Sequence, residues 1–258
     1  MSKFKRIIVA GPLVVEAVYP APHPRDGRAV RQGKKALSSQ AQQMMNLKYA
    51  YQKLELLIAA NFGERDLYAT LTYDNDHLPG NRQEALKKIK AFLKRLRKAR
   101  KEQGQELRYI YVTEHKHRHE DFYMDGRWHH HILNNATGED YDLIRRLWGQ
   151  GNVEFRSIRV DKEKHFESLA RYFCKEQRDK LGLRLWSGSR NLRKPEWECF
   201  RVPDSTPLKM PPPSRVIPLA DTGDVKTAYG HYRYIKYIAK AGMSVRLPRA
   251  KHRRRRKA

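Results

Sequence analysis

An α+β fold of the split ferredoxin-like type is predicted by the order of the elements and by their residue patterns. From residue 67 onward the chain reads as strand, helix, strand, strand, helix, strand and helix. The helices are long and basic, so we expect them to pack on one face of a mostly antiparallel, RRM-like sheet. An N-terminal arm and a basic C-terminal extension are expected to flank this sheet.

Each element follows from a local pattern. Residues 67–73, LYATLTY, are rich in β-branched and aromatic residues, which predicts a strand. Residues 82–101 carry apolar side chains every three or four positions, which predicts a helix, and Asn81 followed by Glu84 is a capping-box signal at its start. The same patterns predict further strands over 107–114, 127–134 and 152–160, and further helices over 36–60, 143–148 and 163–180.

The sequence divides into three regions of different composition. Residues 1–35 are expected to form an irregular N-terminal arm, and residues 36–195 to form the folded domain that carries the chemistry. Residues 196–258 are expected to form a Pro-rich linker, a basic segment rich in tyrosine and a polybasic tail. Seven of the last ten residues are lysine or arginine, so we expect the tail to bind polyanions.

The net charge makes nucleic acid the expected partner. The 54 lysine and arginine residues exceed the 28 acidic residues by 26, which argues against an ordinary metabolite enzyme. Cys174 and Cys199 are the two cysteines, so neither a disulfide scaffold nor a four-cysteine zinc site is expected, and a reducing, cytoplasmic location fits. No apolar run reaches the roughly 18 residues of a membrane span, so no membrane partner is expected.

Six of the eleven histidines lie between 115 and 131, and one pair has the spacing of a metal site. Side chains alternate along a strand, so His129 and His131 point the same way while His130 points to the other face. Glu114 ends the preceding strand and is expected beside this pair. Two imidazoles and one carboxylate suit Mn²⁺ or Mg²⁺ better than a structural zinc. The alternative is a basic strand that contacts phosphates without a metal.

A second register of these two strands stays open. The Asp-Gly pair at 125–126 is a tight-turn signal, and a two-residue hairpin there would place Glu120 opposite His131. We prefer Glu114 as the carboxylate ligand, because the intervening residues are too polar and His-rich for a regular half-buried strand. Glu120 and Asp121 remain alternates.

A tyrosine on the helix expected over 163–180 is the candidate nucleophile. Tyr172 falls at the edge of the buried face of that helix, and Lys175 follows it by nearly one turn. A phenol with a pKa of ~10 is a poor nucleophile at neutral pH, but an adjacent ammonium and a nearby metal would favour the phenolate. The Tyr-x-x-Lys spacing alone is a weak signal, and Tyr237 with Lys240 repeats it.

Three segments, taken in order, resemble the motifs of rolling-circle replication initiators of the HUH endonuclease superfamily, in the branch of small single-stranded DNA phages and plasmids. They are LYATLTYDND (67–76), RYIYVTE with RWHHHILNN (108–114 and 127–135) and LARYFCKE (169–176). SRNLRKP (189–195) also resembles a segment of that branch. The middle residue of the HUH triplet is usually apolar and is His130 here, which leaves a shifted ligand pair with His130 open.

The resemblance implies a mechanism, a cofactor and partners. Tyr172 would attack a DNA phosphate held by Mn²⁺ or Mg²⁺ at the predicted metal centre, and Lys175 would orient the phosphate. A 5′-phosphotyrosine link would form, a 3′-hydroxyl would prime synthesis, and the reverse step would release a circle. The chain has no Gly-x-x-x-x-Gly-Lys-Ser/Thr loop, so a host helicase and polymerase would act at the replication origin.

Two other functions compete with this one. A related HUH transposase or relaxase would share the chemistry, and a non-catalytic single-stranded DNA-binding protein would use the same charge and aromatic side chains. The binding protein leaves the combination of Glu114 with the histidine pair unexplained. The side chains expected to contact DNA are Lys87, Lys94, Arg127 and Arg171, with Arg253, Arg254, Arg255 and Arg256 in the tail.

Overall fold

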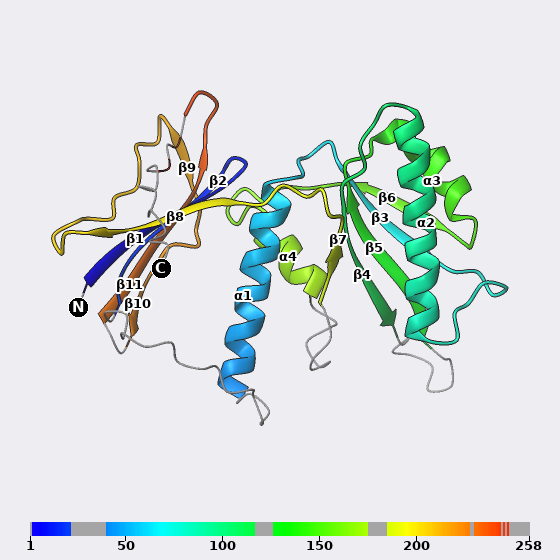
Figure 1. Ribbon diagram of the computed structural model, residues 1–258, viewed down its shortest axis with the longest axis horizontal. Helices are drawn as coiled ribbons and strands as arrows, with labels where there is room; N and C mark the ends of the chain where they lie inside the picture. The colour runs from blue at the N-terminus through cyan, green and yellow to red at the C-terminus, as the bar shows by residue number, and fades with distance from the viewer. Residues whose placement is uncertain are drawn as a thin grey trace, which may run out of the picture. The chain divides into compact units, whose positions relative to one another are not determined.

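The computed structural model describes residues 2–21, 40–116, 126–174, 185–227, 230–243, 245 and 247 (Figure 1). The chain forms two compact units. Unit 1 consists of Met1–Lys48, Asp161–His165 and Lys194–Ala258, and unit 2 consists of Tyr49–Val160 and Phe166–Arg193. Helix α1 (Gln40–Ala59) runs from the first unit into the second. Within the described ranges, no helix is both long and apolar enough to cross a membrane.

Unit 2 is built on a five-stranded antiparallel sheet in the order β6–β3–β5–β4–β7. Its strands are β3 (Leu67–Thr72), β4 (Tyr109–Lys116), β5 (Arg127–Asn134), β6 (Val153–Ser157) and β7 (Ser187–Gly188). Helix α2 (Arg82–Glu102) connects β3 to β4, and the short η1 (Gly138–Asp140) with α3 (Tyr141–Trp148) connects β5 to β6. These two crossovers and the order β6–β3–β5–β4 make a split βαβ arrangement, which confirms the predicted fold class.

The two faces of this sheet carry different side chains. Leu67, Ala69 and Leu71 of β3 are buried in the core that α2 and α3 complete. Tyr68 points to the other face, where its ring lies 5.8 Å from that of Phe173 on α4 (Glu167–Cys174). Packing on one face therefore describes α2 and α3 only, because α4 covers the opposite face (Figure 1). The helical residues in the core are Ile89, Phe92, Leu93, Leu96, Ile144 and Trp148.

Two helix starts differ in how well the sequence marks them. Helix α2 begins as predicted, and the Asn81 side chain accepts a 2.9 Å hydrogen bond from the backbone N–H of Glu84. The sequence predicts the last helix from residue 163, but α4 begins at Glu167. The reason is that His165 adopts a left-handed φ of 52° and pairs with Asp161 in an isolated β-bridge, which no helix accommodates.

Replacing Gly151 by alanine is expected to destabilise unit 2. Gly151 has a φ of 146°, and a Cβ there would lie 2.6 Å from the backbone nitrogen of Asp74 and still closer to the Thr72 carbonyl oxygen. Backbone atoms cannot turn aside as a flexible side chain can, so we expect the free energy of unfolding to fall by roughly 2–3 kcal/mol. Urea denaturation measures this loss. The matched control is Gly63→Ala, where a Cβ meets no atom within 4 Å, and equal stability of the two variants would contradict the packing.

Unit 1 is a second antiparallel sheet, in which five strands follow the order β10–β11–β2–β1–β8 and β9 pairs with β11. Its strands are β1 (Ser2–Ala10), β2 (Leu13–Ala21), β8 (Glu196–Val202), β9 (Val216–Pro218), β10 (Gly223–Thr227) and β11 (Gly230–Ala239). The hairpin of β1 and β2 turns at Gly11, whose φ of 58° suits the first position of a two-residue turn.

Residues 2–21 therefore do not form the irregular arm that the sequence predicts, and the C-terminal region is more than a linker and a tail. Strand β8 pairs with β1, and β11 pairs with β2. Ile7, Val14, Val216 and Tyr237 from the two ends of the chain form one buried cluster. Neither end has a complete apolar core of its own, so a reading of local patterns cannot find this sheet. Residues 22–35 and the last ten residues lie outside the described ranges.

Candidate active site

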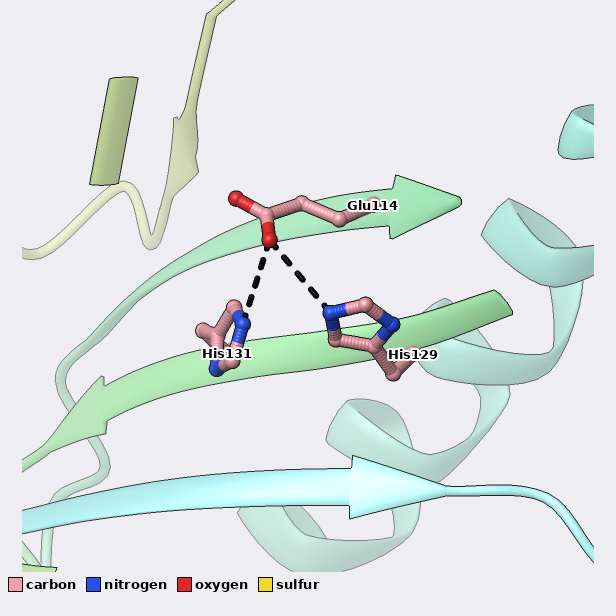
Figure 2. Close-up of side chains that lie close together, drawn as sticks. All are labelled: Glu114, His129 and His131. Carbon is pink, nitrogen blue, oxygen red and sulfur yellow. Dashed lines mark ion pairs between the residues drawn. The ribbon is translucent and has the colours of Figure 1, made fainter. Parts of the chain in front are cut away.

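A carboxylate and two imidazoles converge on the face of the unit 2 sheet turned away from α2 and α3 (Figure 2). Oε2 of Glu114 lies 3.4 Å from Nε2 of His129 and 3.2 Å from Nε2 of His131. One ligand atom from each residue lies within 4.8 Å of the others. Glu114 is 4% exposed and His131 is 6% exposed, whereas His129 is partly exposed. We call these three residues the Glu/His/His cluster.

The register of β4 and β5 produces this convergence. Glu114 lies directly opposite His129, and His131 follows two residues later on the same face. The alternative register that would bring Glu120 opposite His131 is not formed. Glu120 and Asp121 themselves lie outside the described residues.

Each histidine of the cluster is oriented through its other ring nitrogen. Nδ1 of His129 lies 3.3 Å from the carbonyl oxygen of Arg127, which can only accept, so Nδ1 carries the proton and Nε2 keeps its lone pair. Nδ1 of His131 lies 2.6 Å from the Tyr68 hydroxyl and 3.2 Å from the Thr70 hydroxyl. A hydroxyl accepts as well as donates, so His131 can also present an Nε2 lone pair to the cluster.

The donor set of the cluster fits a divalent cation. Two imidazole nitrogens and one carboxylate oxygen are ligands that first-row divalent metals accept. Three protein ligands leave coordination positions for water or a substrate oxygen, whereas a structural zinc site is closed by four. The buried group can therefore hold a metal ion that also touches a substrate.

His130 points into the core and takes no part in the cluster. It is fully buried, with Nε2 2.7 Å from the Tyr73 hydroxyl and Nδ1 2.8 Å from the Thr113 hydroxyl. Burial, and then the neighbouring His129 and His131, lower the pKa of His130 to about 3, so it stays neutral. The alternative in which His130 serves as a ligand is wrong, because strand alternation turns its side chain to the opposite face.

Replacing His130 by leucine is expected to lower stability while preserving metal binding. Leucine fills much of the space but makes no hydrogen bond to the Tyr73 and Thr113 hydroxyls, and a buried polar group that loses its partner costs about 1–3 kcal/mol. We expect a lower urea midpoint and an unchanged Mn²⁺ stoichiometry by calorimetry under conditions where the variant is folded. A folded variant that bound no Mn²⁺ would instead place His130 among the ligands.

Tyr172 on α4 lies beside the cluster. Its ring is 50% exposed, and its centroid lies 5.8 Å from that of the His131 ring. Tyr68 makes a hydrogen bond with Tyr172, and burial, followed by this neighbour, raises the pKa of Tyr68 well above the usual range of a phenol. The fold thus brings the predicted nucleophile to the predicted metal ligands. Lys175 lies outside the described residues.

The other tyrosine with the same spacing, Tyr237, is a core residue of unit 1. It is 1% exposed, and its hydroxyl donates a 2.7 Å hydrogen bond to Glu16. Burial and this carboxylate raise the pKa of Tyr237. A tyrosine in this position cannot reach a DNA phosphate while the sheet is folded.

The cations predicted to contact DNA are spread over the surface. Lys87 and Lys94 are exposed on α2, the helix that covers the face opposite to the cluster. Arg171 on α4 pairs with Glu167 at 2.7 Å, and its guanidinium lies 5.5 Å from the centre of the Tyr51 ring. These side chains are not gathered at the cluster. Arg253, Arg254, Arg255 and Arg256 lie outside the described residues.

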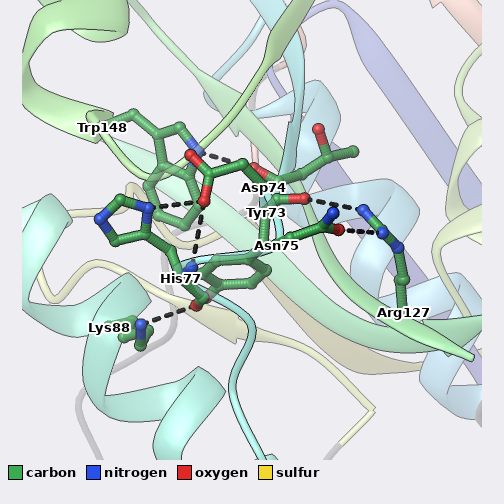
Figure 3. Close-up of polar contacts among 8 residues, drawn as sticks. Tyr73, Asp74, Asn75, His77, Lys88, Arg127 and Trp148 are labelled. Atoms are coloured by element: carbon green, nitrogen blue, oxygen red, sulfur yellow. Dashed lines mark hydrogen bonds and ion pairs between the residues drawn. The ribbon is translucent and has the colours of Figure 1, made fainter. Parts of the chain in front are cut away.

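Arg127 is the predicted DNA contact that lies closest in sequence to the metal ligands, and the loop after β3 holds it (Figure 3). Its guanidinium donates to the Tyr73 carbonyl oxygen at 3.4 Å and to the Asn75 side chain. In the same loop, the Asp74 carboxylate lies 2.6 Å from Nδ1 of His77. Arg127 shares the strand face of the two histidine ligands by alternation, so this loop fixes a positive charge beside the cluster.

Tyr68 and Thr70, which contact the cluster, were not predicted from the sequence. Both come from β3, where Thr70 lies opposite His131. The signal that could have found them is the period of two in LYATLT, since its polar residues alternate with buried ones. An alternating strand next to a histidine strand predicts a polar face on the sheet.

A split βαβ sheet that carries a Glu/His/His cluster beside a half-exposed tyrosine defines a candidate metal-binding domain of the α+β class. Residues 66–177, which include the cluster and Tyr172, match the family of the replication-associated protein ORF2. This match confirms the resemblance of that segment to replication initiators, is consistent with rolling-circle initiation and implies DNA binding. The comparisons with curated proteins and with solved structures gave no significant match.

Proposed function

We propose that the protein initiates rolling-circle replication by nicking single-stranded DNA at a replication origin and later rejoining it. The observation that carries this proposal is the half-exposed Tyr172, with its ring 5.8 Å from that of His131 in the Glu/His/His cluster. A nucleophile beside a group that can hold a cation is what transfer of a phosphodiester requires. The match of residues 66–177 and the net charge of +26 both support a DNA substrate.

In the proposed step, the phenolic oxygen of Tyr172 attacks the phosphorus of one DNA phosphodiester. A bond forms between this oxygen and phosphorus, and the bond from phosphorus to the 3′ oxygen of the preceding nucleotide breaks. The phenolic proton ends on that 3′ oxygen. The products are a 5′-phosphotyrosine and a 3′-hydroxyl, and attack by a 3′-hydroxyl on the phosphotyrosine reverses the step and closes a circle.

Tyr68 is the positioning residue for this attack. It makes a hydrogen bond with Tyr172, and its hydroxyl lies 2.6 Å from Nδ1 of His131. Through these contacts, Tyr68 sets the position of the nucleophile relative to one metal ligand. A hydroxyl that donates to the Tyr172 oxygen also stabilises negative charge on it. Lys175, about one turn further along the chain, is proposed to orient the phosphate.

We propose Mn²⁺ or Mg²⁺ as the cation that Glu114, His129 and His131 hold. A bound divalent cation would polarise a phosphate oxygen and offset the charge that develops on it. The two histidines contribute by keeping Nε2 directed at the cluster, because the Arg127 carbonyl and the Tyr68 hydroxyl engage their Nδ1 atoms.

The other partners follow from the chemistry. A 3′-hydroxyl needs a polymerase to extend it, and strand displacement needs a helicase, so we propose that both come from a host in whose cytoplasm the protein acts. The cations proposed to contact DNA phosphates are Lys87, Lys94, Arg127 and Arg171, with Arg253, Arg254, Arg255 and Arg256.

Single-stranded origin DNA of the parent replicon, labelled at one end, tests this proposal. With Mn²⁺ present, a 3′ label should migrate with the protein on a denaturing gel, and a 5′ label should appear on a shorter free strand that a polymerase extends. The reverse pattern would contradict a 5′-phosphotyrosine. No adduct from either substrate, with DNA binding intact, would favour the non-catalytic DNA-binding protein.

A further inference from the structure

One face of the unit 1 sheet carries a row of aromatic rings that the proposed chemistry does not use. Phe4 of β1 lies opposite Tyr19 of β2, and their ring centroids are 6.4 Å apart. The Tyr19 ring lies 5.4 Å from that of Tyr232 on β11, which lies 6.0 Å from that of Tyr234. The planes of the first two ring pairs deviate from parallel by only 26° and 31°, so the rings form one row across three neighbouring strands.

Cations lie at the β8 end of this row. Arg201 lies opposite Phe4, and Arg6 is on the same face two residues further along β1. The Arg6 guanidinium lies 5.2 Å from the centre of the Trp197 ring, and Trp197 is 57% exposed. The two arginines are exposed, and the rings of the row are partly exposed. We call this surface the aromatic face, and it consists of Phe4, Arg6, Tyr19, Trp197, Arg201, Tyr232 and Tyr234.

Charge is segregated between the two faces of this sheet. Every carboxylate within β1, β2, β8, β10 and β11 points to the opposite face, and these residues are Glu16, Glu196, Glu198 and Asp224. Glu16 and Glu198, for example, both lie opposite Ile7, which is in the core. One carboxylate from a loop, Asp221, reaches the edge of the aromatic face, where Tyr234 donates a 2.8 Å hydrogen bond to it. The strands themselves present aromatic rings and positive charge on the aromatic face.

We propose that the aromatic face binds single-stranded DNA, with unpaired bases stacked on Phe4, Tyr19 and Tyr232. Every base has a π face that an aromatic ring can stack on, and a sheet that displays such rings can hold two or three bases without reading their sequence. Arg6 and Arg201 attract the phosphates that connect those bases. A duplex hides the faces of its bases, so a row of rings gives it no comparable contact.

This site lies on residues that the replication-associated match at 66–177 does not include, and it needs no residue of the Glu/His/His cluster. The choice of DNA over RNA as its natural ligand rests on the proposed function. The aromatic face would hold a stretch of the displaced or incoming strand independently of whether that strand is cut. Its affinity can therefore be measured on DNA that carries no origin.

Paired substitutions of two rings test the stacking. Fluorescence anisotropy with a labelled short oligothymidylate compares the full-length protein, Tyr19→Leu with Tyr232→Leu, and Tyr19→Phe with Tyr232→Phe. Loss of two stacking rings is expected to weaken binding by roughly tenfold or more, and the phenylalanine pair should bind as the unmodified protein does. Circular dichroism and the thermal midpoint show whether the leucine pair is folded, and the phenylalanine pair keeps the test valid if it is not, since weakened binding by that pair would overturn stacking.

A matched pair of charge variants provides the second readout. Arg6→Gln with Arg201→Gln removes two cations from the aromatic face, and Lys226→Gln with Arg233→Gln removes two from the opposite face. The slope of log K against log salt should become less steep by about 1.4 for the first pair, because each phosphate contact on a single strand contributes about 0.7. The second pair should leave the slope unchanged. Equal slopes for the two pairs would overturn the assignment of this face.

The ligand class is tested with duplex DNA and oligouridylate. The leucine pair should bind duplex DNA as the unmodified protein does, and tighter binding of oligouridylate than of oligothymidylate would reassign the face to RNA. These outcomes are independent of the nicking assay. If no covalent adduct forms but the leucine pair still loses oligothymidylate affinity, the proposed function fails and this site stands.

Discussion

Tyr172→Phe should abolish the covalent protein–DNA adduct and leave DNA affinity unchanged. The substitution removes one oxygen, and without it no bond to phosphorus can form. The Tyr172 side chain is half exposed, so its replacement should not disturb the core. The loss of a covalent nucleophile is expected to reduce the rate by about 10⁴-fold or more, which on a denaturing gel reads as no adduct.

Two control tyrosines sharpen this result. Tyr237→Phe should keep the adduct, because Tyr237 is 1% exposed in unit 1, although the loss of its hydrogen bond to Glu16 should lower stability. Tyr68→Phe removes the hydrogen bond to Tyr172 but no reacting atom, so it should slow adduct formation without abolishing it. An adduct that persists in Tyr172→Phe and vanishes in Tyr237→Phe would move the nucleophile to the other unit.

Removing a ligand of the Glu/His/His cluster should have the next largest effect. Glu114→Gln keeps the shape of the side chain and removes its charge, and His131→Gln removes an imidazole nitrogen. The contribution of a divalent cation to charge stabilisation is several kcal/mol, so nicking should fall by roughly 10³-fold or more in either variant. EDTA should have the same effect on the unmodified protein, and added Mn²⁺ should reverse it.

Mn²⁺ titration by calorimetry separates metal binding from activity. The unmodified protein should bind one ion at the cluster, and Glu114→Gln should bind it much more weakly while its affinity for single-stranded DNA is retained. His130→Leu, one residue from two of the ligands, is the matched control and should keep the ion when folded, because His130 lies on the other face. Full nicking by a Glu114→Gln variant in the presence of EDTA would contradict a role of the cluster in the reaction.

Local patterns were sufficient to predict unit 2. The apolar spacing of α2, its cap at Asn81 and the alternation of β3 are all written in consecutive residues, and the resulting order of elements allows few topologies. Unit 1 could not be predicted in this way. Its strand β1 pairs with β8, nearly two hundred residues later, and the pairing depends on burying Ile7 and Val14 against Tyr237. Such non-local pairing leaves no signal in a single stretch of sequence.

The candidate site was predictable as far as strand alternation determines it. Alternation places His129 and His131 on one face and His130 on the other, and the structure has this arrangement. The position of Glu114 depends on the register of β4 with β5 across a long connection, so the sequence left Glu120 open. The contacts of Tyr68 with His131 and Tyr172 depend on how β3 and α4 pack, which no spacing within one element reveals.

Peptide mapping of the adduct is the measurement that tests the proposed function most directly. The covalent complex formed with origin DNA and Mn²⁺ would be digested with nuclease and protease, and the peptide that retains a nucleotide would be sequenced by mass spectrometry. We expect the nucleotide on Tyr172, joined through its 5′ phosphate. A nucleotide on any other residue, or on no peptide in a preparation that binds the DNA and Mn²⁺, would contradict nicking by the tyrosine beside the Glu/His/His cluster.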